Sequence, residues 1–195
     1  MFQPTIENDK INELPVAQYP GEIIVVDTYD KCLSALKKIS QFDLLGFDTE
    51  TRPSFKKGRM NKVALLQLAT SETAWLFRLT KIGFPASLLR ILEDVHIKKV
   101  GVAIHEDLNR LKIQKEFLPA NFIDLAKYVK EFNILDNGLR KLAANILKLK
   151  ISKAQQLSNW ESVKLIPQQL NYAATDAWVC YEIYNQLLNL RYDLS

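Results

Sequence analysis

Long apolar runs and cysteines are scarce in this sequence. Apolar runs such as residues 63–66 and 100–104 are far too short to cross a bilayer. The only two cysteines, Cys32 and Cys180, lie in no Cys-x-x-Cys pair and no Cys/His cluster, which excludes a disulfide framework. The N-terminal residues lack the apolar segment of a secretory signal. These absences predict a cytoplasmic protein with no membrane segment.

Internal repeats and low-complexity segments are also missing. Hydrophobic residues make up 48% of the 195 residues and charged residues 25%, which excludes a disordered, collagen-like or coiled-coil chain. This length suits one domain with its own core. Pro4, Pro15 and Pro20 interrupt a start with little periodicity. We therefore expect an N-terminal arm over residues 1–20 that packs on a single domain over residues 21–195.

Hydrophobic periodicity predicts the secondary structure. Strands are expected over residues 22–27, 44–49, 62–69, 73–79, 99–104 and 122–125. Helices are expected over residues 29–41, 85–95, 105–115, 126–132, 139–147 and 167 to about 190. Strands crowd the first two-thirds of the chain and alternate with helices later. This order favours the α/β class, with a mixed β-sheet covered by α-helices.

Acidic residues are absent from two windows, although the net charge of +4 is too small to identify a partner. The window between Glu50 and Glu72 contains Arg52, Lys56, Lys57, Arg59 and Lys62. The window over residues 137–160 contains five further cations. Such cations position a phosphate backbone without reading its sequence, and Phe55 could stack on a terminal base. The alternative is a solvated basic loop with Phe55 packed into the domain.

Two carboxylates stand close together in Asp48-Thr49-Glu50. On a strand, residues i and i+2 face the same side, so Asp48 and Glu50 would project together. Adjacent carboxylates repel unless a cation or a proton compensates them. They are therefore a candidate site for a hard divalent cation, which prefers oxygen ligands. The alternative is a solvated strand end.

Two further acids, Asp176 and Asp107, are candidate site residues because of their positions on helices. Tyr172 and Asp176 share one face of the final helix, and the small residues between them let that helix approach a neighbour closely. Asp107 lies in the first turn of a helix that follows an apolar strand. Each also has a structural explanation: a core tyrosine with a surface aspartate, and a carboxylate that suits the helix dipole.

In this order and at these distances, the three motifs resemble those of the DEDD family of 3′→5′ exonucleases, which has the ribonuclease H-like fold. The sequence Phe47-Asp48-Thr49-Glu50 looks like the first motif and Asp107 like the second. Tyr172-x-x-x-Asp176 looks like the third, in the tyrosine subtype of the family. The resemblance implies a mixed β-sheet flanked by α-helices.

The likeness covers residues 22–190 and points to one branch of the family. Segments similar to the Werner-syndrome exonuclease and ribonuclease D branch are residues 62–68 (KVALLQL), 158–160 (SNW) and 169–177 (QLNYAATDA). The histidine subtype carries His five residues before its last Asp, where this chain has Asn171. The polymerase-proofreading branch has Asn at the position of Ala103. That departure weakens the proofreading comparison and leaves the Werner-like one intact.

The resemblance implies hydrolysis of phosphodiester bonds at a 3′ end by a two-metal mechanism, with release of nucleoside monophosphates. As in the family, Asp48 should bridge two ions, while Glu50 and Asp176 hold the ion that carries the attacking water. Asp107 should hold the other ion, largely through water. Two Mg²⁺ ions, with Mn²⁺ as a substitute, suit four carboxylates. Tyr172, with a reference pKa of about 10, should orient water and not act as a strong base.

The expected substrate is nucleic acid with a free 3′ end. DNA is favoured over RNA, because the sequence to Ser195 has no room for the helical domains of ribonuclease D. A ribonuclease D-like enzyme that processes RNA 3′ ends is one alternative. A second is a nucleic-acid-binding module without catalysis, against which all four acids and the tyrosine argue. A third is an endonuclease of the ribonuclease H type, which would release internal fragments.

Overall fold

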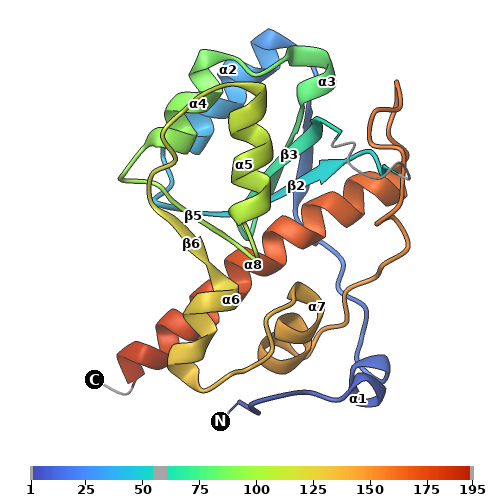
Figure 1. The fold of residues 1–195 in the computed structure, drawn as a ribbon, viewed down its shortest axis with the longest axis vertical. Helices are drawn as coiled ribbons and strands as arrows, with labels where there is room; N and C mark the ends of the chain where they lie inside the picture. The colour runs from blue at the N-terminus through green and yellow to red at the C-terminus, as the bar shows by residue number, and fades with distance from the viewer. Residues whose placement is uncertain (1, 55–60, 194–195) are drawn as a thin grey trace.

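The computed structural model describes residues 2–54 and 61–193 (Figure 1). Within these residues, six strands form one sheet in the order β1-β4-β3-β2-β5-β6. The strands are β1 (Glu22–Val26), β2 (Leu44–Thr51), β3 (Val63–Ala69), β4 (Thr73–Arg78), β5 (Lys98–Gly101) and β6 (Phe122–Asp124). Strand β3 is antiparallel to its neighbours β2 and β4, and the other pairs are parallel. The predicted mixed sheet of the α/β class is confirmed.

Helices cover both faces of this sheet (Figure 1). They are α1 (Asn8–Asn12), α2 (Tyr29–Ile39), α3 (Leu79–Ile82), α4 (Ala86–Glu93), α5 (His105–Gln114), α6 (Leu125–Tyr128), α7 (Leu139–Leu142) and α8 (Pro167–Asp193). A 3₁₀ turn (Val129–Phe132) continues α6, and a π-helical turn (Ala143–Leu147) continues α7. Helices α2 and α4 pack on one face of the sheet, and α8 packs on the other. The sequence did not predict α1 and α3.

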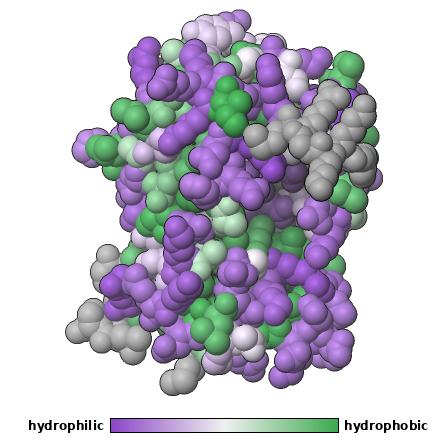
Figure 2. Space-filling view, in the orientation of Figure 1, coloured by the Kyte–Doolittle hydropathy of each residue, from purple (hydrophilic) through white to green (hydrophobic). Residues whose placement is uncertain are grey.

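No helix of the described ranges is long and apolar enough to span a membrane. Figure 2 shows a face with mostly hydrophilic side chains, on which hydrophobic residues occur in small groups. The apolar residues are instead gathered against the sheet, where all seven residues of β3 are buried. Burial on both faces explains why β3 reads as an almost continuous apolar run, interrupted by Gln67.

Helix α8 lies very close to β2. Ala173, Ala174 and Ala177 face the sheet and are fully buried. A Cβ atom added to Gly46 of β2 would lie 1.9 Å from the carbonyl oxygen of Ala177. Only glycine therefore permits this approach. As the sequence predicted, the small residues of α8 let this helix approach its neighbour closely.

The strand expected over residues 99–104 ends early, at Gly101. Ala103 has a φ of 56°, in the left-handed region that an L-residue seldom adopts. Its N–H donates to Asp124 Oδ1 over 2.9 Å, and the same oxygen accepts the Ala126 N–H over 3.0 Å. This carboxylate from the neighbouring strand thus stabilises a turn into α5 that local periodicity does not reveal.

The N-terminal arm packs beside the π-helical turn. Ile11 of α1 is fully buried there against Ala144. Arg140 donates to the side chain of Asn12 over 3.0 Å, and Lys150 donates to the Asn12 carbonyl over 2.8 Å. Cations of the acid-free window over residues 137–160 therefore hold the arm. The expected role of this window in binding a phosphate backbone stays a prediction.

Candidate active site

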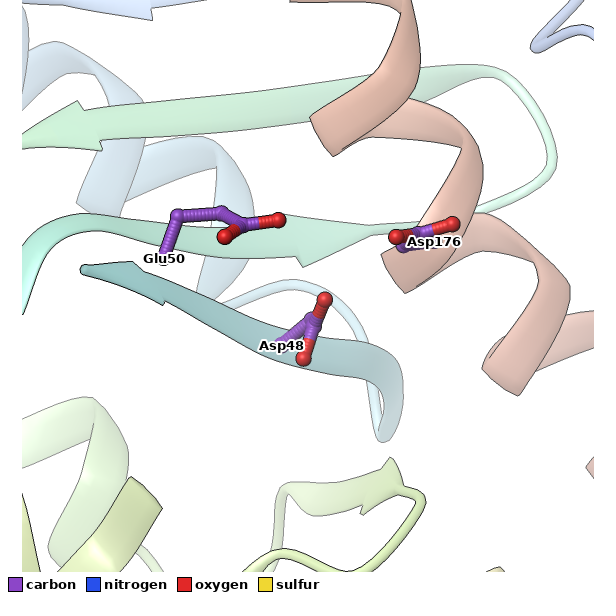
Figure 3. A group of neighbouring side chains, drawn as sticks. All are labelled: Asp48, Glu50 and Asp176. Atoms are coloured by element: carbon purple, nitrogen blue, oxygen red, sulfur yellow. The ribbon is translucent and has the colours of Figure 1, made fainter. Parts of the chain in front are cut away.

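Strand β2 presents Asp48 and Glu50 on the sheet face that α8 covers, because alternate residues of a strand share a face. Asp176 points toward them from α8 (Figure 3). One carboxylate oxygen from each of the three residues lies within 4.8 Å of the other two. The close approach at Gly46 accounts for this proximity, because Asp176 immediately precedes Ala177. Residues far apart in sequence thus form one carboxylate trio.

Asp107 lies beside the trio but outside it. Its Oδ1 accepts a short hydrogen bond from the hydroxyl of Thr49, the residue between Asp48 and Glu50. Asp107 is still close enough for its charge to raise the pKa of Asp48. The structure therefore brings all four predicted acids to one end of β2 and gathers three of them within contact of a single cation.

Burial raises the pKa values of these acids, and mutual repulsion adds to the shift for Asp48 and Glu50. Burial, followed by the charges of Asp176 and Asp107, raises the pKa of Asp48 well above its usual range. Burial and the charge of Asp48 raise the pKa of Glu50 to about 10. Burial also raises the pKa of Asp176 to about 7, although the Tyr172 hydroxyl acts in the opposite direction. A cation among these groups would displace protons and remove the repulsion.

The residues present fit a divalent cation. Asp176 is 5% exposed, and its buried Oδ1 has no hydrogen-bond partner among the residues that the structure describes. A buried carboxylate oxygen without a donor is costly unless a positive charge compensates it. The three potential ligands are all carboxylates, and hard cations such as Mg²⁺ and Mn²⁺ prefer oxygen. The trio is therefore a candidate metal site.

Without a divalent cation, the free energy of unfolding should fall as the pH rises from about 6 to 8. Asp176 has a folded-state pKa of about 7, above its unfolded value of about 3.9. Its stabilising effect is complete below the unfolded pKa and is lost as the pH rises through the folded one. Urea unfolding in EDTA across this range measures the decline.

Asp176→Asn is the control for this pH dependence, because it removes the group that titrates near pH 7 and should make the decline shallower. Glu50, with a folded-state pKa of about 10, continues to contribute to the decline. A free energy of unfolding that stays constant from pH 6 to 8 in the wild-type protein would contradict the raised pKa. Higher pH is avoided, because burial lowers the pKa of Lys99 to about 8. Folded protein releases the Lys99 proton at a lower pH than unfolded protein does. The free energy of unfolding therefore gains a contribution that rises with pH above about 8.

Tyr172 lies one turn before Asp176 on α8. Burial, followed by the charges of Asp176 and Glu50, raises the pKa of its hydroxyl above the ordinary value. The phenol therefore keeps its proton and is a hydrogen-bond donor beside the carboxylates. Its ring packs near Trp160, with 6.0 Å between the ring centroids. This environment is consistent with the predicted positioning role.

Cavities adjoin the acids on two sides. One, of about 430 Å³, is lined by Tyr172 and Asp176 together with uncharged polar side chains, those of Gln18, Gln155 and Asn171. The other, of about 680 Å³, is lined by Asp48 and by two exposed lysines, Lys127 and Lys130. Neither lysine was predicted from the sequence as a site residue. Their three-residue spacing directly after β6 was the available signal.

Four of the predicted substrate-binding residues, Phe55, Lys56, Lys57 and Arg59, lie outside the described residues. The other two, Arg52 and Lys62, are exposed on either side of that segment. Arg52 Nη1 is 3.4 Å from Glu161 Oε2, an exposed ion pair that contributes little stability. Asn61 donates to the Arg52 carbonyl over 2.8 Å and so ties the two sides together beyond the end of β2.

Comparison with known proteins supports the resemblance drawn from the motifs. The sequence model of the 3′–5′ exonuclease family matches residues 23–190. The mouse bifunctional 3′–5′ exonuclease/ATP-dependent helicase WRN is 32% identical over 92% of this chain, which spans 14% of that protein. A 3′–5′ exonuclease of Arabidopsis thaliana is 31% identical over 93% of this chain and 68% of its own length. The chain thus spans a small part of the first relative.

Solved structures show the same fold. The Nibbler EXO domain of Aedes aegypti superposes with a TM-score of 0.82 at 22% identity, over 92% of this chain and 94% of that one. Ribonuclease D of Escherichia coli superposes with a TM-score of 0.76 at 24% identity, over 86% of this chain and 44% of that one. The predicted ribonuclease H-like fold is confirmed. With its family match over residues 23–190, the chain belongs to the 3′–5′ exonuclease family.

Proposed function

We propose that this protein is a metal-dependent 3′→5′ exonuclease that hydrolyses phosphodiester bonds at the 3′ end of nucleic acid and releases nucleoside monophosphates. The observation that carries the proposal is the carboxylate trio, whose oxygens lie within 4.8 Å of one another, in a chain of this family. Residues 21–195 would form one catalytic domain, and residues 1–20 an arm that packs on it.

Asp48, Glu50 and Asp176 would hold the cation, and Asp107 would add its carboxylate from the neighbouring helix α5. When bound, two Mg²⁺ or Mn²⁺ ions would supply the positive charge that activates water and stabilises the leaving oxygen. Thr49 holds Asp107 in place through its hydroxyl. The Tyr172 phenol, which keeps its proton, donates a hydrogen bond that orients the water or the scissile phosphate.

DNA is the proposed substrate, because the sequence motifs resemble the Werner-syndrome branch. The mouse relative, a bifunctional 3′–5′ exonuclease/ATP-dependent helicase, belongs to that branch by name. RNA is the second candidate. The observation that favours it is the similarity in fold to Escherichia coli ribonuclease D, described as an exoribonuclease involved in structured RNA processing. The cavity beside Tyr172, of about 430 Å³ and lined mostly by uncharged side chains, is within the size range of ligand pockets and could take a terminal nucleoside of either kind.

Matched DNA and RNA oligonucleotides labelled on the 3′-terminal nucleotide test this function. With Mg²⁺ or Mn²⁺ we expect labelled mononucleotide from the first time point, and none with EDTA. Faster release from DNA than from RNA supports the DNA preference. Release of internal fragments would indicate an endonuclease, and binding without release would indicate a module that lacks catalysis.

The double variant Lys127→Gln, Lys130→Gln should bind a single strand more weakly and with a lower salt dependence. Both lysines line the cavity that contains Asp48. Each phosphate contact adds about 0.7 to the slope of log affinity against log salt for single strands. Fluorescence anisotropy at several salt concentrations, with Ca²⁺ in place of Mg²⁺, measures this slope.

A control of equal charge is Lys37→Gln, Lys38→Gln on α2, the helix that packs on the opposite face of the sheet. We expect this control to keep the wild-type slope. If the Lys127/Lys130 variant keeps that slope too, the strand does not pass along the second cavity.

A further inference from the structure

Gln67 is the one amide in the apolar run of β3, and it is paired directly with Asp48 across the antiparallel β2–β3 ladder. Directly opposed residues of such a ladder share a face, with Cβ atoms about 4.5–5.5 Å apart. Gln67 therefore lies on the face that α8 covers, beside the carboxylate trio.

The amide is buried without a visible partner. Gln67 is 0% exposed, and neither Nε2 nor Oε1 has a hydrogen-bond partner among the described residues. Apart from Asp48, its neighbours within the sheet on this face are apolar: Leu65 and Ala69 two positions away on β3, and Leu76 opposite it on β4. An apolar side chain of similar size would suit this packing at least as well. Core packing alone therefore does not explain an amide at this position.

The unpaired amide and an unpaired carboxylate oxygen lie on the same side of the sheet. Asp176 Oδ1, on the helix that covers this face, is likewise buried and unpartnered within the described part of the chain. An amide NH₂ offers two donors, and an ionised carboxylate offers only acceptors. Carboxylates that bind a metal usually take hydrogen bonds that fix their orientation.

We infer that Gln67 is a positioning residue for the metal site: its NH₂ group donates to the Asp48 carboxylate when a divalent cation is bound. This inference rests on the proposed function. Loss of such a partner typically weakens metal binding about 10- to 100-fold. Gln67 does not touch the substrate, so its effect acts through the orientation of Asp48.

Gln67→Met tests this role, because methionine has a similar shape and no hydrogen-bond donor. We expect Mn²⁺ binding, measured by calorimetry, to weaken about 10- to 100-fold. In EDTA the Tm of the variant should equal or exceed that of the wild type, because an unpaired buried amide is removed. A purely structural role predicts the opposite: a lower Tm in EDTA and unchanged Mn²⁺ affinity.

Gln114→Met is the matched control. Gln114 also has a buried Nε2 without a partner in the described ranges, but it lies at the end of α5 and not on the α8 face. This control should keep the wild-type Mn²⁺ affinity. Equal affinity in Gln67→Met, Gln114→Met and wild type would overturn the inference, whereas no Mn²⁺ binding by the wild type would overturn the proposed metal site itself.

A measurement on the unmodified side chain covers the case in which Gln67→Met does not fold. In the NMR spectrum of the wild-type protein, addition of Mg²⁺ should move one proton of the Gln67 NH₂ group downfield, because it enters a hydrogen bond. The Gln114 NH₂ resonances should stay in place. An unmoved Gln67 resonance at saturating Mg²⁺ would overturn the inference.

Discussion

Asp48→Asn is expected to lower the rate of mononucleotide release by at least about 10²- to 10³-fold, the loss typical of removing one group that stabilises transition-state charge. The charges of both Asp176 and Asp107 raise the pKa of Asp48, so its carboxylate lies close to the other acids. Asparagine keeps the shape of the side chain and removes the negative charge that would hold the cation. Release of a 3′-terminal label at saturating Mg²⁺ measures the effect.

The same variant should be more stable than the wild type in EDTA at about pH 8. In the folded state, burial and the charge of Asp176 destabilise the ionised form of Asp48. Replacing the acid with a neutral amide removes this unfavourable interaction. Activity and metal-free stability should thus change in opposite directions, which a misfolded variant cannot imitate. Thermal unfolding in EDTA provides the second measurement.

The loss of activity in Asp48→Asn is compared with that in Tyr172→Phe. Tyr172→Phe removes one hydroxyl and no charge, so measurable mononucleotide release should remain. Wild-type turnover in Asp48→Asn at saturating Mg²⁺ would contradict the metal site. Complete inactivity of a folded Tyr172→Phe would contradict a role limited to orientation.

Gly46→Ala is expected to lower both stability and activity. The added Cβ would lie 1.9 Å from the Ala177 carbonyl oxygen and 3.1 Å from the Cβ of Tyr181. Backbone atoms cannot rotate away, so α8 must move off the sheet. Overpacking of this kind costs about 1–3 kcal/mol, which corresponds to a Tm roughly 2–12 °C lower for a chain of this size. Because Asp176 moves with α8, a displacement of about 1 Å would lower turnover about 10²-fold.

Gly138→Ala is the control for Gly46→Ala. A Cβ at Gly138 would meet nothing within 4 Å, and its φ of −101° suits any residue. Its Tm should change by no more than a few degrees, which is the effect of about 1 kcal/mol at a helix N-cap. Wild-type Tm and turnover in Gly46→Ala would mean that α8 does not lie against β2 as described.

Local patterning sufficed to predict the strands and most of the helices. The alternation around Asp48 and Glu50 placed both carboxylates on one face, and the four-residue spacing of Tyr172 and Asp176 placed them one helical turn apart. Both relations involve residues within one turn or one strand, where backbone geometry sets the distance. The cytoplasmic location stays a prediction from composition.

Sequence alone did not reveal which cations face the site. The window over residues 137–160 looked like a basic wall, yet Arg140 and Lys150 bind Asn12 of the N-terminal arm. Lys127 and Lys130, which were not predicted as site residues, line the cavity beside Asp48. A lysine can reach a phosphate or a backbone carbonyl equally well, so its partner depends on which distant segment folds beside it.

The sequence by itself determined the four acids and the strand and two helices that carry them, together with the small residues that let one helix approach closely. Only the tertiary structure decided how far apart those acids lie, that Thr49 holds Asp107, and that the buried Gln67 stands opposite Asp48. The reason is that backbone periodicity acts over a few residues. Distances across a sheet depend on strand register and on how closely a helix packs, which involve residues far beyond that range.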